Sequence, residues 1–272
     1  MLNDCVISRF HDKETHDTIL FKNRDRAYNP ILEIVREYRD NIEIVYMRDV
    51  VTDWSEGLNS KGVGILNSAL SVGYDENEKM IVKKTGKKSK DGKVIRNALY
   101  QPSFKESVKS LLNFESGVRG HTIISKPDKY IIIESTSKHN PKIKGSNEMK
   151  NIVRTNHGFF HVSAGYTEGD NYLSSKVRKD KSLEVVSSVK NYKDLPAAIR
   201  KNFYNYGQLN PVRNSGKIYT TSQTMMNLDK LEFNLYLLEG KYEEFQGVRN
   251  VNIPQGYDNQ IKINVYQVKR KK

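Results

Sequence analysis

Short segments of β-branched and aromatic residues lie at both ends of the chain, and they constrain its fold more than any other feature. Turn-forming residues bound most of these segments, which is typical of strands. The predicted strands cover 5–10, 18–21, 42–46, 121–124, 130–133, 217–221, 231–238 and 261–268. Strands of this kind must bury their apolar faces against each other or against helices, so the pattern favours a layered fold.

Helical patterns lie between these strands. The predicted helices cover 30–38, 103–112, 172–189 and 195–204. Pro30 begins the first of them, a position where proline is tolerated, and Ser103 with Glu106 forms a capping box at the start of the second. No linker divides the chain, so we predict one α+β domain over residues 1–272.

The chain has 272 residues and a single cysteine, Cys5, which excludes an intramolecular disulfide and a Cys-rich zinc site. No stretch approaches the ~20 consecutive apolar residues that a membrane span requires. The N-terminus lacks the basic and apolar regions of a secretory signal. We therefore expect a soluble, cytoplasmic protein that needs no cofactor and does not enter a membrane.

The net charge of +13 is concentrated in two places. Residues 83–96 carry +6 and the tail 269–272 carries +4, which leaves an ordinary balance elsewhere. We predict that the first region is the tip of a basic hairpin over 80–95. Two interpretations stay open: a solvated hairpin and a frayed tail, or a surface that guides an anionic partner. Nucleic acid is not an expected partner, because no helix-turn-helix, ribonucleoprotein or zinc-finger pattern is present.

Four segments carry residues with chemical potential. They are Cys5 at the start of the first strand, Lys22-Asn23-Arg24-Asp25 at the end of the second, the glycine-rich segment 56–70, and Arg154-Thr155-Asn156-His157. Each segment alone has an ordinary structural explanation, such as a buried thiol, a polar strand end or tight packing. Their order and spacing along one chain are more informative than any one of them.

In that order the segments resemble the cysteine branch of the N-terminal nucleophile (Ntn) hydrolases. The chain looks most like relatives of acyl-CoA:6-aminopenicillanate acyltransferase, with choloylglycine hydrolases and acid ceramidases further off. The resemblance covers most of the chain, since residues 220–238 also look like the closing strands of that family. It implies an αββα sandwich, in which two packed antiparallel sheets carry helices on their outer faces.

The resemblance also implies a division of labour among four residues. Cys5 supplies the nucleophilic thiol, and its own α-amino group, with an ordinary pKa of ~7.7–8.0, accepts the proton. Asp25 orients that amine. Asn67 donates to the oxyanion of the tetrahedral intermediate, and Asn156 holds the amine or shares the oxyanion.

Supporting roles follow from the same resemblance for five further residues. They are Lys22, Arg24, Asn59, His157 and Arg178. Lys22 stands where the family has arginine, and it keeps the charge without the planar fork. His157 and His161 are four residues apart, but two histidines do not make a metal site, and no metal is expected.

A free amine on Cys5 requires removal of residues 1–4, and we hypothesise self-cleavage at the Asp4–Cys5 bond. The expected function is then cleavage or transfer at a linear carbon–nitrogen amide of a small-molecule substrate, through an acyl-enzyme on Cys5. The acyl group, the acceptor and the oligomeric state stay open. The alternatives are a catalytically silent protein of the same fold and a basic nucleic-acid- or anion-binding module.

Overall fold

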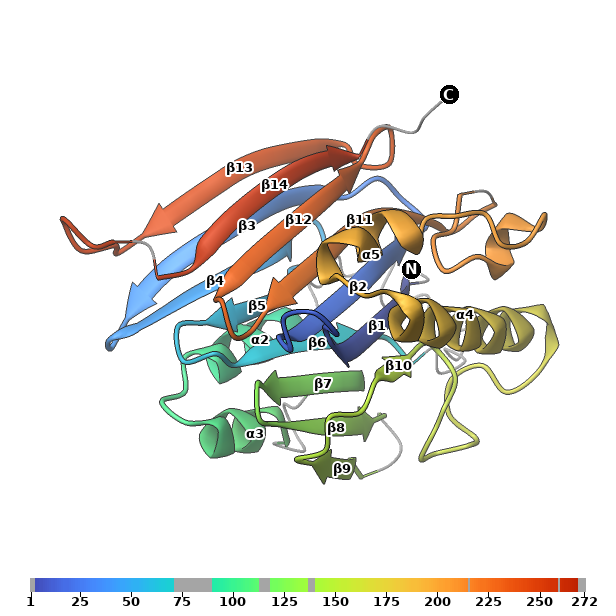
Figure 1. The fold of residues 1–272 in the computed structure, drawn as a ribbon, viewed down its shortest axis with the longest axis horizontal. Helices are drawn as coiled ribbons and strands as arrows, with labels where there is room; N and C mark the ends of the chain where they lie inside the picture. Colours follow the sequence, from blue (N-terminus) through green and yellow to red (C-terminus); the bar gives the residue numbers. More distant parts are fainter. Residues whose placement is uncertain are drawn as a thin grey trace.

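The computed structural model describes residues 3–70, 90–112, 118–136, 140–214, 216–258 and 260–268. Their strands form two sheets that stack face to face (Figure 1). The six-stranded sheet has the order β10 (Ile152–Arg154), β1 (Asn3–His11), β2 (Thr18–Arg26), β11 (Tyr219–Asn227), β12 (Glu232–Leu238) and β14 (Lys262–Val268). The eight-stranded sheet has the order β13 (Glu244–Val251), β3 (Ile31–Arg39), β4 (Ile42–Asp49), β5 (Trp54–Asn59), β6 (Gly64–Ser68), β7 (Gly120–Lys126), β8 (Lys129–Ser135) and β9 (Lys142–Ser146).

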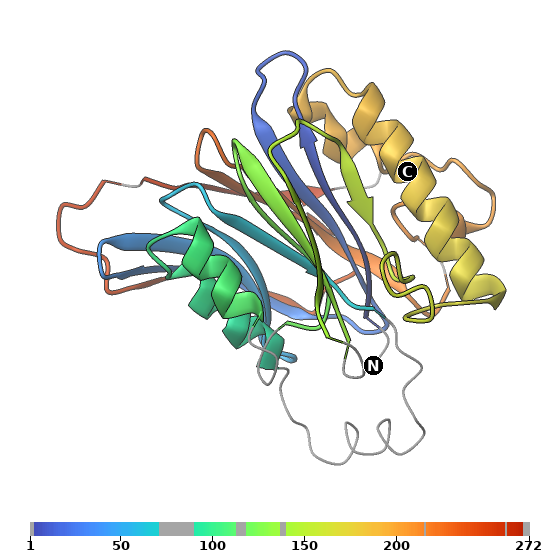
Figure 2. The same ribbon diagram turned by 90° about the horizontal axis from the view of Figure 1, so that it is seen from below.

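Helices cover the outer face of each sheet. α2 (Lys90–Leu99) and α3 (Phe104–Leu112) lie on the eight-stranded sheet, while α4 (Gly169–Ser188) and the short α5 (Leu195–Ala198) lie on the six-stranded one. Figure 2 shows these two helical groups on opposite sides of the strands. The molecule is therefore an αββα sandwich. No helix in the described ranges is long and apolar enough to cross a bilayer.

The strand alternation divides the core into three apolar clusters. The cluster between the sheets contains Cys5 and Ile7 of β1 together with Leu58 and Leu66 of the facing sheet. Val6 points the opposite way, into the cluster beneath α4 and α5. Because neighbouring side chains of a strand point to opposite faces, each residue of β1 belongs to one of these layers only.

Most predicted strands and two predicted helices are confirmed. Ser103 Oγ accepts a hydrogen bond from the backbone N–H of Glu106 at 3.3 Å, which is the capping interaction expected at the start of α3. The charged pattern over 172–189 corresponds to α4. The helix predicted over 195–204 is too long, because α5 ends after one turn at Ala198.

The helix predicted over 30–38 is wrong, because this segment is the strand β3. β3 pairs in antiparallel register with β4 through the turn residues Asp40 and Asn41, whose φ angles are 51° and 61°. Two successive positive φ angles match the right-handed twist of a hairpin. Leu32 and Ile34 are buried between the sheets and Val35 is buried beneath the helices, so apolar residues on both faces gave the strand a helix-like pattern.

The basic hairpin predicted over 80–95 is also wrong in its returning strand, since residues 90–99 form α2. Ile95, Ala98 and Leu99 share one face of this helix and are buried in the outer cluster. Residues 71–89, which hold most of the basic run, and the tail 269–272 lie outside the described residues.

The expectation of two antiparallel sheets needs a correction at one edge of each sheet. β14 pairs with β12 in parallel, and β13 pairs with β3 in parallel. The chain leaves β12 for the other sheet, forms β13 there and returns as β14. A strand that returns to its sheet after such a crossover can lie parallel to the strand it left, which a hairpin cannot do.

The antiparallel pairing of β1 with β2 positions the residues that the sequence singled out. Cys5 lies opposite Arg24, and Asp4 lies opposite Asp25. β10 pairs with the other side of β1 and leads directly to Asn156. β6 passes close beneath β2: a Cβ on Gly64 would lie 2.7 Å from Leu20 Cδ1, so a larger residue there would displace the leucine side chain.

Candidate active site

The thiol of Cys5 is buried between the sheets beside a guanidinium group. Cys5 is 1% exposed and Arg26 is fully buried. Arg26 Nη1 donates to Cys5 Sγ at 3.6 Å and to the carbonyl oxygen of Asp25 at 2.7 Å. Arg26 Nε and Nη2 are buried without a hydrogen-bond partner among the described residues, and Nε lies 3.8 Å from Asp49 Oδ2 in an ion pair. A guanidinium group that is paired with Asp49 and keeps a donor unused therefore lies next to the sulfur.

Lys22 and Arg24 lie on the same face of β2 but are engaged by a carboxylate. Lys22 Nζ lies 3.0 Å from Glu56 Oε2, and Arg24 Nε donates to Glu56 Oε1 at 3.3 Å. Burial opposes ionisation of Glu56, but the charges of Arg24 and Lys22 outweigh it and lower the pKa of this carboxyl to about 2. Burial lowers the pKa of Lys22 as well. These ion pairs fix β2 against β5 beneath the thiol.

The backbone nitrogen of Cys5 has a separate set of partners. It donates to Asn156 Oδ1 at 3.3 Å, and Arg178 Nη2 donates to the same oxygen at 3.1 Å. Asn156 Nδ2 donates to the carbonyl oxygen of Ala69 at 2.7 Å and to Ser68 Oγ at 3.3 Å. The orientation of the Asn156 amide is therefore set from both ends.

Two acids and two arginines form a buried ion cluster on the helix side of the sheet. Asp25 Oδ2 lies 2.9 Å from Arg178 Nη1, and Asp25 Oδ1 accepts from Thr220 Oγ1 at 2.7 Å. Asp4 Oδ2 lies 2.8 Å from Arg213 Nη1 and 3.7 Å from Arg178 Nη2. Burial raises the pKa of Asp25, and the arginine charges oppose this shift.

The structure brings four of the predicted residues together around Asp4: Cys5, Asp25, Asn156 and Arg178. Asn156 contacts the backbone nitrogen of Cys5 and Arg178, and Arg178 in turn contacts Asp25. The thiol itself faces the other layer, where it meets Arg26.

Asn67 is not brought into this group. Its Nδ2 donates to the carbonyl oxygen of Arg119 at 3.0 Å and to Thr122 Oγ1 at 2.8 Å. It lies on the face of β6 that Ile65 shares, beneath the outer helices. The neighbouring Ser68 takes the inward position, and its Oγ donates to the carbonyl oxygen of Cys5 at 3.3 Å.

Asn59 and His157 shape turns. Asn59 Oδ1 accepts from the backbone N–H groups of Lys61 and Val63, which fixes the connection between β5 and β6. His157 Nδ1 lies 2.9 Å from Ser175 Oγ, and this contact docks the turn after β10 onto α4. Burial lowers the pKa of His157 to about 4, so the ring is neutral near pH 7.

Several site residues have weak sequence signals or none. Arg26 could have been found, because it shares a strand face with Arg24 and Arg24 pairs with Cys5. Ser68 could be identified in the same way, because side chains alternate between the two faces of β6 and Ser68 lies on the inward face. The Tyr166 hydroxyl donates to Asp4 Oδ1 at 3.1 Å. Arg213 and Tyr166 lie in loops far along the chain, and no local pattern connects them to Asp4.

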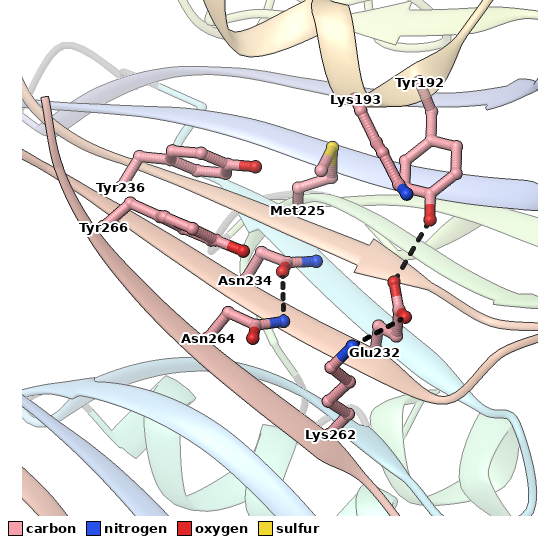
Figure 3. Close-up of a pocket in the computed structure, with 9 residues that line it drawn as sticks. All are labelled: Tyr192, Lys193, Met225, Glu232, Asn234, Tyr236, Lys262, Asn264 and Tyr266. Carbon is pink, nitrogen blue, oxygen red and sulfur yellow. Dashed lines mark hydrogen bonds and ion pairs between the residues drawn. The ribbon is translucent and has the colours of Figure 1, made fainter.

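No group of three or more histidine, cysteine or acidic side chains in the described part of the chain could hold a metal ion. A pocket of about 270 Å³ lies away from Cys5, on the helix-covered side of β12 and β14 (Figure 3). The rings of Tyr236 and Tyr266 stack at its edge with centroids 4.8 Å apart. Asn264 Nδ2 donates to Asn234 Oδ1 at 2.8 Å across its floor. None of the predicted site residues lines this pocket.

No family model and no curated protein matches the chain. Among solved structures, it is similar to the Caenorhabditis elegans ortholog of N-acylethanolamine-hydrolyzing acid amidase, with 15% sequence identity and a TM-score of 0.60 over 82% of this chain and 93% of that one. Penicillin V acylase from Agrobacterium tumefaciens aligns with 10% identity and a TM-score of 0.45, covering 86% of each chain. The likeness to the amidase confirms the sandwich fold that the sequence resemblance implies.

The position of Asn67 predicts an effect on stability rather than on chemistry. Asn67→Ala leaves the oxygens of Arg119 and Thr122 without their donor, so the free energy of unfolding should fall by about 1–3 kcal/mol. The matched variant Asn156→Ala should abolish turnover. Urea unfolding and amide turnover of both variants check this. A loss of turnover in Asn67→Ala as large as that in Asn156→Ala would restore the sequence-based role of Asn67.

The buried His121 predicts loss of stability in mild acid. Its Nε2 donates to the carbonyl oxygen of His157, and burial lowers its pKa to about 4. The unfolded chain takes up this proton near pH 6.5, so unfolding should become easier by about 3 kcal/mol as the pH falls from 6.5 to 4. His157 acts in the same direction.

Urea unfolding at pH 7.0, 5.5 and 4.5 measures this slope. His121→Gln should flatten the slope even though it lowers stability at pH 7. Glu56 does not confound the measurement, because a carboxyl with a folded pKa of about 2 loses stability only below its unfolded pKa near 4.5. A wild-type stability that stays constant from pH 7.0 to 4.5 would contradict the prediction.

Proposed function

We propose that this chain, as one domain over residues 1–272, is an Ntn cysteine amidohydrolase or acyltransferase that acts on a linear amide of a small molecule. One observation carries the proposal. The backbone nitrogen of Cys5 is held by Asn156 beside the Asp25–Arg178 ion pair, while its thiol lies against Arg26. Freed as an amine, that nitrogen would have the partners that an intramolecular base requires.

Activation requires cleavage of the Asp4–Cys5 peptide bond. Cys5 Sγ attacks the carbonyl carbon of Asp4, and the C–N bond breaks as the nitrogen of Cys5 takes up a proton. A thioester then joins Asp4 to the sulfur. Water hydrolyses this thioester, which releases Asp4 with a new α-carboxylate and leaves Cys5 with a free thiol and a free α-amine.

The same groups then serve the substrate. The α-amine of Cys5 accepts the thiol proton as Sγ bonds to the substrate carbonyl carbon. Collapse of the tetrahedral intermediate breaks the substrate C–N bond, and the proton passes from the α-amine to the leaving amine. Water or an acceptor amine attacks the resulting thioester. The acceptor that reaches the thioester decides between hydrolysis and acyl transfer.

The contacts of the amine suit it to this task. Asn156 Oδ1 accepts a hydrogen bond from the nitrogen and so orients its lone pair. Arg178 lies against Asn156 and Asp25, and a positive group next to an amine disfavours the protonated form of that amine. An amine that stays unprotonated near neutral pH can accept the thiol proton.

We assign the oxyanion to Arg26 rather than to Asn67. Arg26 Nη1 already donates toward Cys5 Sγ, and its Nε and Nη2 are buried donors that lack hydrogen-bond partners among the described residues. An oxygen that becomes negatively charged next to the sulfur would accept a hydrogen bond from such a donor. A buried guanidinium stabilises this charge more strongly than it would in water.

Intact mass of the purified chain tests the first step. The wild type should lack residues 1–4, and Cys5→Ala should retain them, because no thiol is present to attack Asp4. Cys5→Ser should cleave more slowly than the wild type. The cleaved wild type should release amine from a panel of simple N-acyl amides. An uncleaved wild type with no amidase activity would favour the silent or basic binding alternatives.

Arg26 offers a test of the chemical step. Arg26→Lys keeps the charge but loses the planar fork, and kcat should fall by about 10²-fold or more with little change in KM. Lys22→Arg is the comparison variant, since Lys22 Nζ forms its ion pair with Glu56. An Arg26→Lys variant with unchanged kcat would remove Arg26 from the mechanism.

A further inference from the structure

The proposed activation makes Asp4 the first acyl group that the sulfur of Cys5 carries. Sγ attacks the carbonyl carbon of Asp4, and the resulting thioester joins that carbon to the sulfur. The contacts of the Asp4 side chain therefore lie on the acyl side of the bond that breaks. They show which chemical groups surround an acyl chain at this position.

The Asp4 side chain is held as firmly as a residue of the core. It is fully buried. Its Oδ2 lies 2.8 Å from Arg213 Nη1, and its Oδ1 accepts from the Tyr166 hydroxyl at 3.1 Å. Arg178 Nη2 lies 3.7 Å from Oδ2. These groups form a carboxylate-binding site, which the chain fills with its own side chain before cleavage.

The acyl chain of a substrate would enter this site for a geometric reason. Cys5 Sγ and the proposed oxyanion donor Arg26 act on Asp4 first and on the substrate afterwards. The nitrogen of the breaking bond is that of Cys5 in the first reaction, and in the second it must lie next to the Cys5 nitrogen to receive its proton. The tetrahedral carbon has one direction left, so the acyl chain follows the direction of the Asp4 Cα.

Cleavage would leave the site with an excess of positive charge. Before cleavage two acids, Asp4 and Asp25, face two arginines, Arg178 and Arg213. After it, Asp25 alone faces both arginines and the new amine of Cys5. Arg213 Nε is buried without a hydrogen-bond partner among the described residues and lies 4.0 Å from Asp25 Oδ2. An unpaired buried guanidinium is costly, so the vacated site favours an anion.

Arg213 is anchored independently of Asp4. Its Nη2 donates to Ser174 Oγ at 3.0 Å, and Ser174 Oγ donates to the carbonyl oxygen of Gln208 at 2.6 Å. Its backbone N–H donates to Thr220 Oγ1 at 2.9 Å. These contacts fix the guanidinium from elements that cleavage does not remove, so the site remains available to an acyl group.

We infer that the substrate is an amide of a short dicarboxylic acid, whose free carboxylate binds Arg213 and Tyr166 in the place of the Asp4 side chain. This inference rests on the proposed function and names the acyl half of its substrate. In Asp4 two carbons separate the carbonyl carbon from the carboxylate carbon, which is the spacing of a succinyl group. Charge-assisted hydrogen bonds favour such an anion over an apolar acyl chain of the same shape.

The expected reaction follows the proposed mechanism without a further reactant. Sγ bonds to the amide carbon of the dicarboxylic acyl group, the C–N bond breaks, and the amine leaves with the proton from the α-amine of Cys5. Water then hydrolyses the thioester and releases the dicarboxylic acid. The carboxylate that binds Arg213 keeps its charge throughout.

Amides with one leaving group and matched acyl chains test the inference. Succinyl 4-nitroanilide would be compared with 4-methylpentanoyl 4-nitroanilide, and glutaryl with 5-methylhexanoyl 4-nitroanilide, by release of 4-nitroaniline from the cleaved protein. Each pair differs by a carboxylate against an isopropyl group of the same shape. At least one acid should exceed its partner in kcat/KM by about tenfold or more. Ratios near one in both pairs would overturn the inference while leaving the proposed amidase function intact.

Paired substitutions isolate Arg213. Arg213→Gln alone would remove the arginine partner of Asp4 and so disturb folding as well as binding. The double variant Asp4→Asn/Arg213→Gln places two neutral side chains together, and cleavage then removes the substituted residue at position 4. Asp4→Asn alone is the control, because after cleavage its sequence equals that of the wild type. The double variant should lose the preference for the acid by about tenfold or more relative to this control.

Binding decides the outcome if the cleaved protein turns over none of these amides. Calorimetric titration with succinyl and 4-methylpentanoyl 4-nitroanilide should show about tenfold or more tighter binding of the acid, and the double variant should lose that difference. Equal affinity for both would overturn the inference. A wild type that retains residues 1–4 would overturn it together with the proposed activation.

Discussion

The architecture of the site depends on pairing buried charges across two neighbouring strands. Asp4 and Asp25 lie opposite each other on β1 and β2, and like charges so placed would repel strongly in a dry interior. Arg178 and Arg213 neutralise them. On the other face of β2, Lys22 and Arg24 pair with Glu56, and Asp49 Oδ2 lies 3.8 Å from both Arg24 Nη1 and Arg26 Nε. The β1–β2 pair can therefore lie at the centre of the sandwich only because each face has counter-charges from other elements.

Strand alternation explains why the backbone nitrogen of Cys5 is the centre of the site. The thiol lies between the sheets with Arg26, whereas Asp25 and Arg178 lie on the helix side. A side-chain base on the helix side would lie across the sheet from the sulfur. The main-chain nitrogen lies in the plane of the sheet and can contact both layers. The proposed use of that nitrogen as the base would solve a geometric problem that the sheet itself creates.

The strand and helix patterns predicted the layers, and the family resemblance implied the grouping of Cys5, Asp25, Asn156 and Arg178. The sequence failed where both faces of a strand are buried, since β3 then has the apolar spacing of a helix. It also placed Asn67 with the nucleophile. That placement depends on which face of β6 points inward, and the motif cannot show a one-residue difference in register.

Residues from distant loops were beyond local patterns for a different reason. Arg213 precedes β11 and Tyr166 follows β10, and they reach Asp4 because β11 pairs with β2 and β10 pairs with β1. Their role follows from the charge of a buried carboxylate, which must find a partner wherever the fold provides one. The buried carboxylate of the folded structure identifies Arg213 and Tyr166 as its partners, whereas spacing along the chain does not.

The balance of buried charge around Asp4 also connects folding with the proposed activity. With Asp4 in place, the helix-side cluster is balanced and contributes to a stable core. Without Asp4, the cluster would have a surplus of positive charge next to a new amine. A chain that folds with the Asp4 carboxylate in place can assemble two buried arginines that would be costly to bury without it. The proposed cleavage after folding would then leave a preorganised cluster, because the surrounding strands and α4 already fix its arginines.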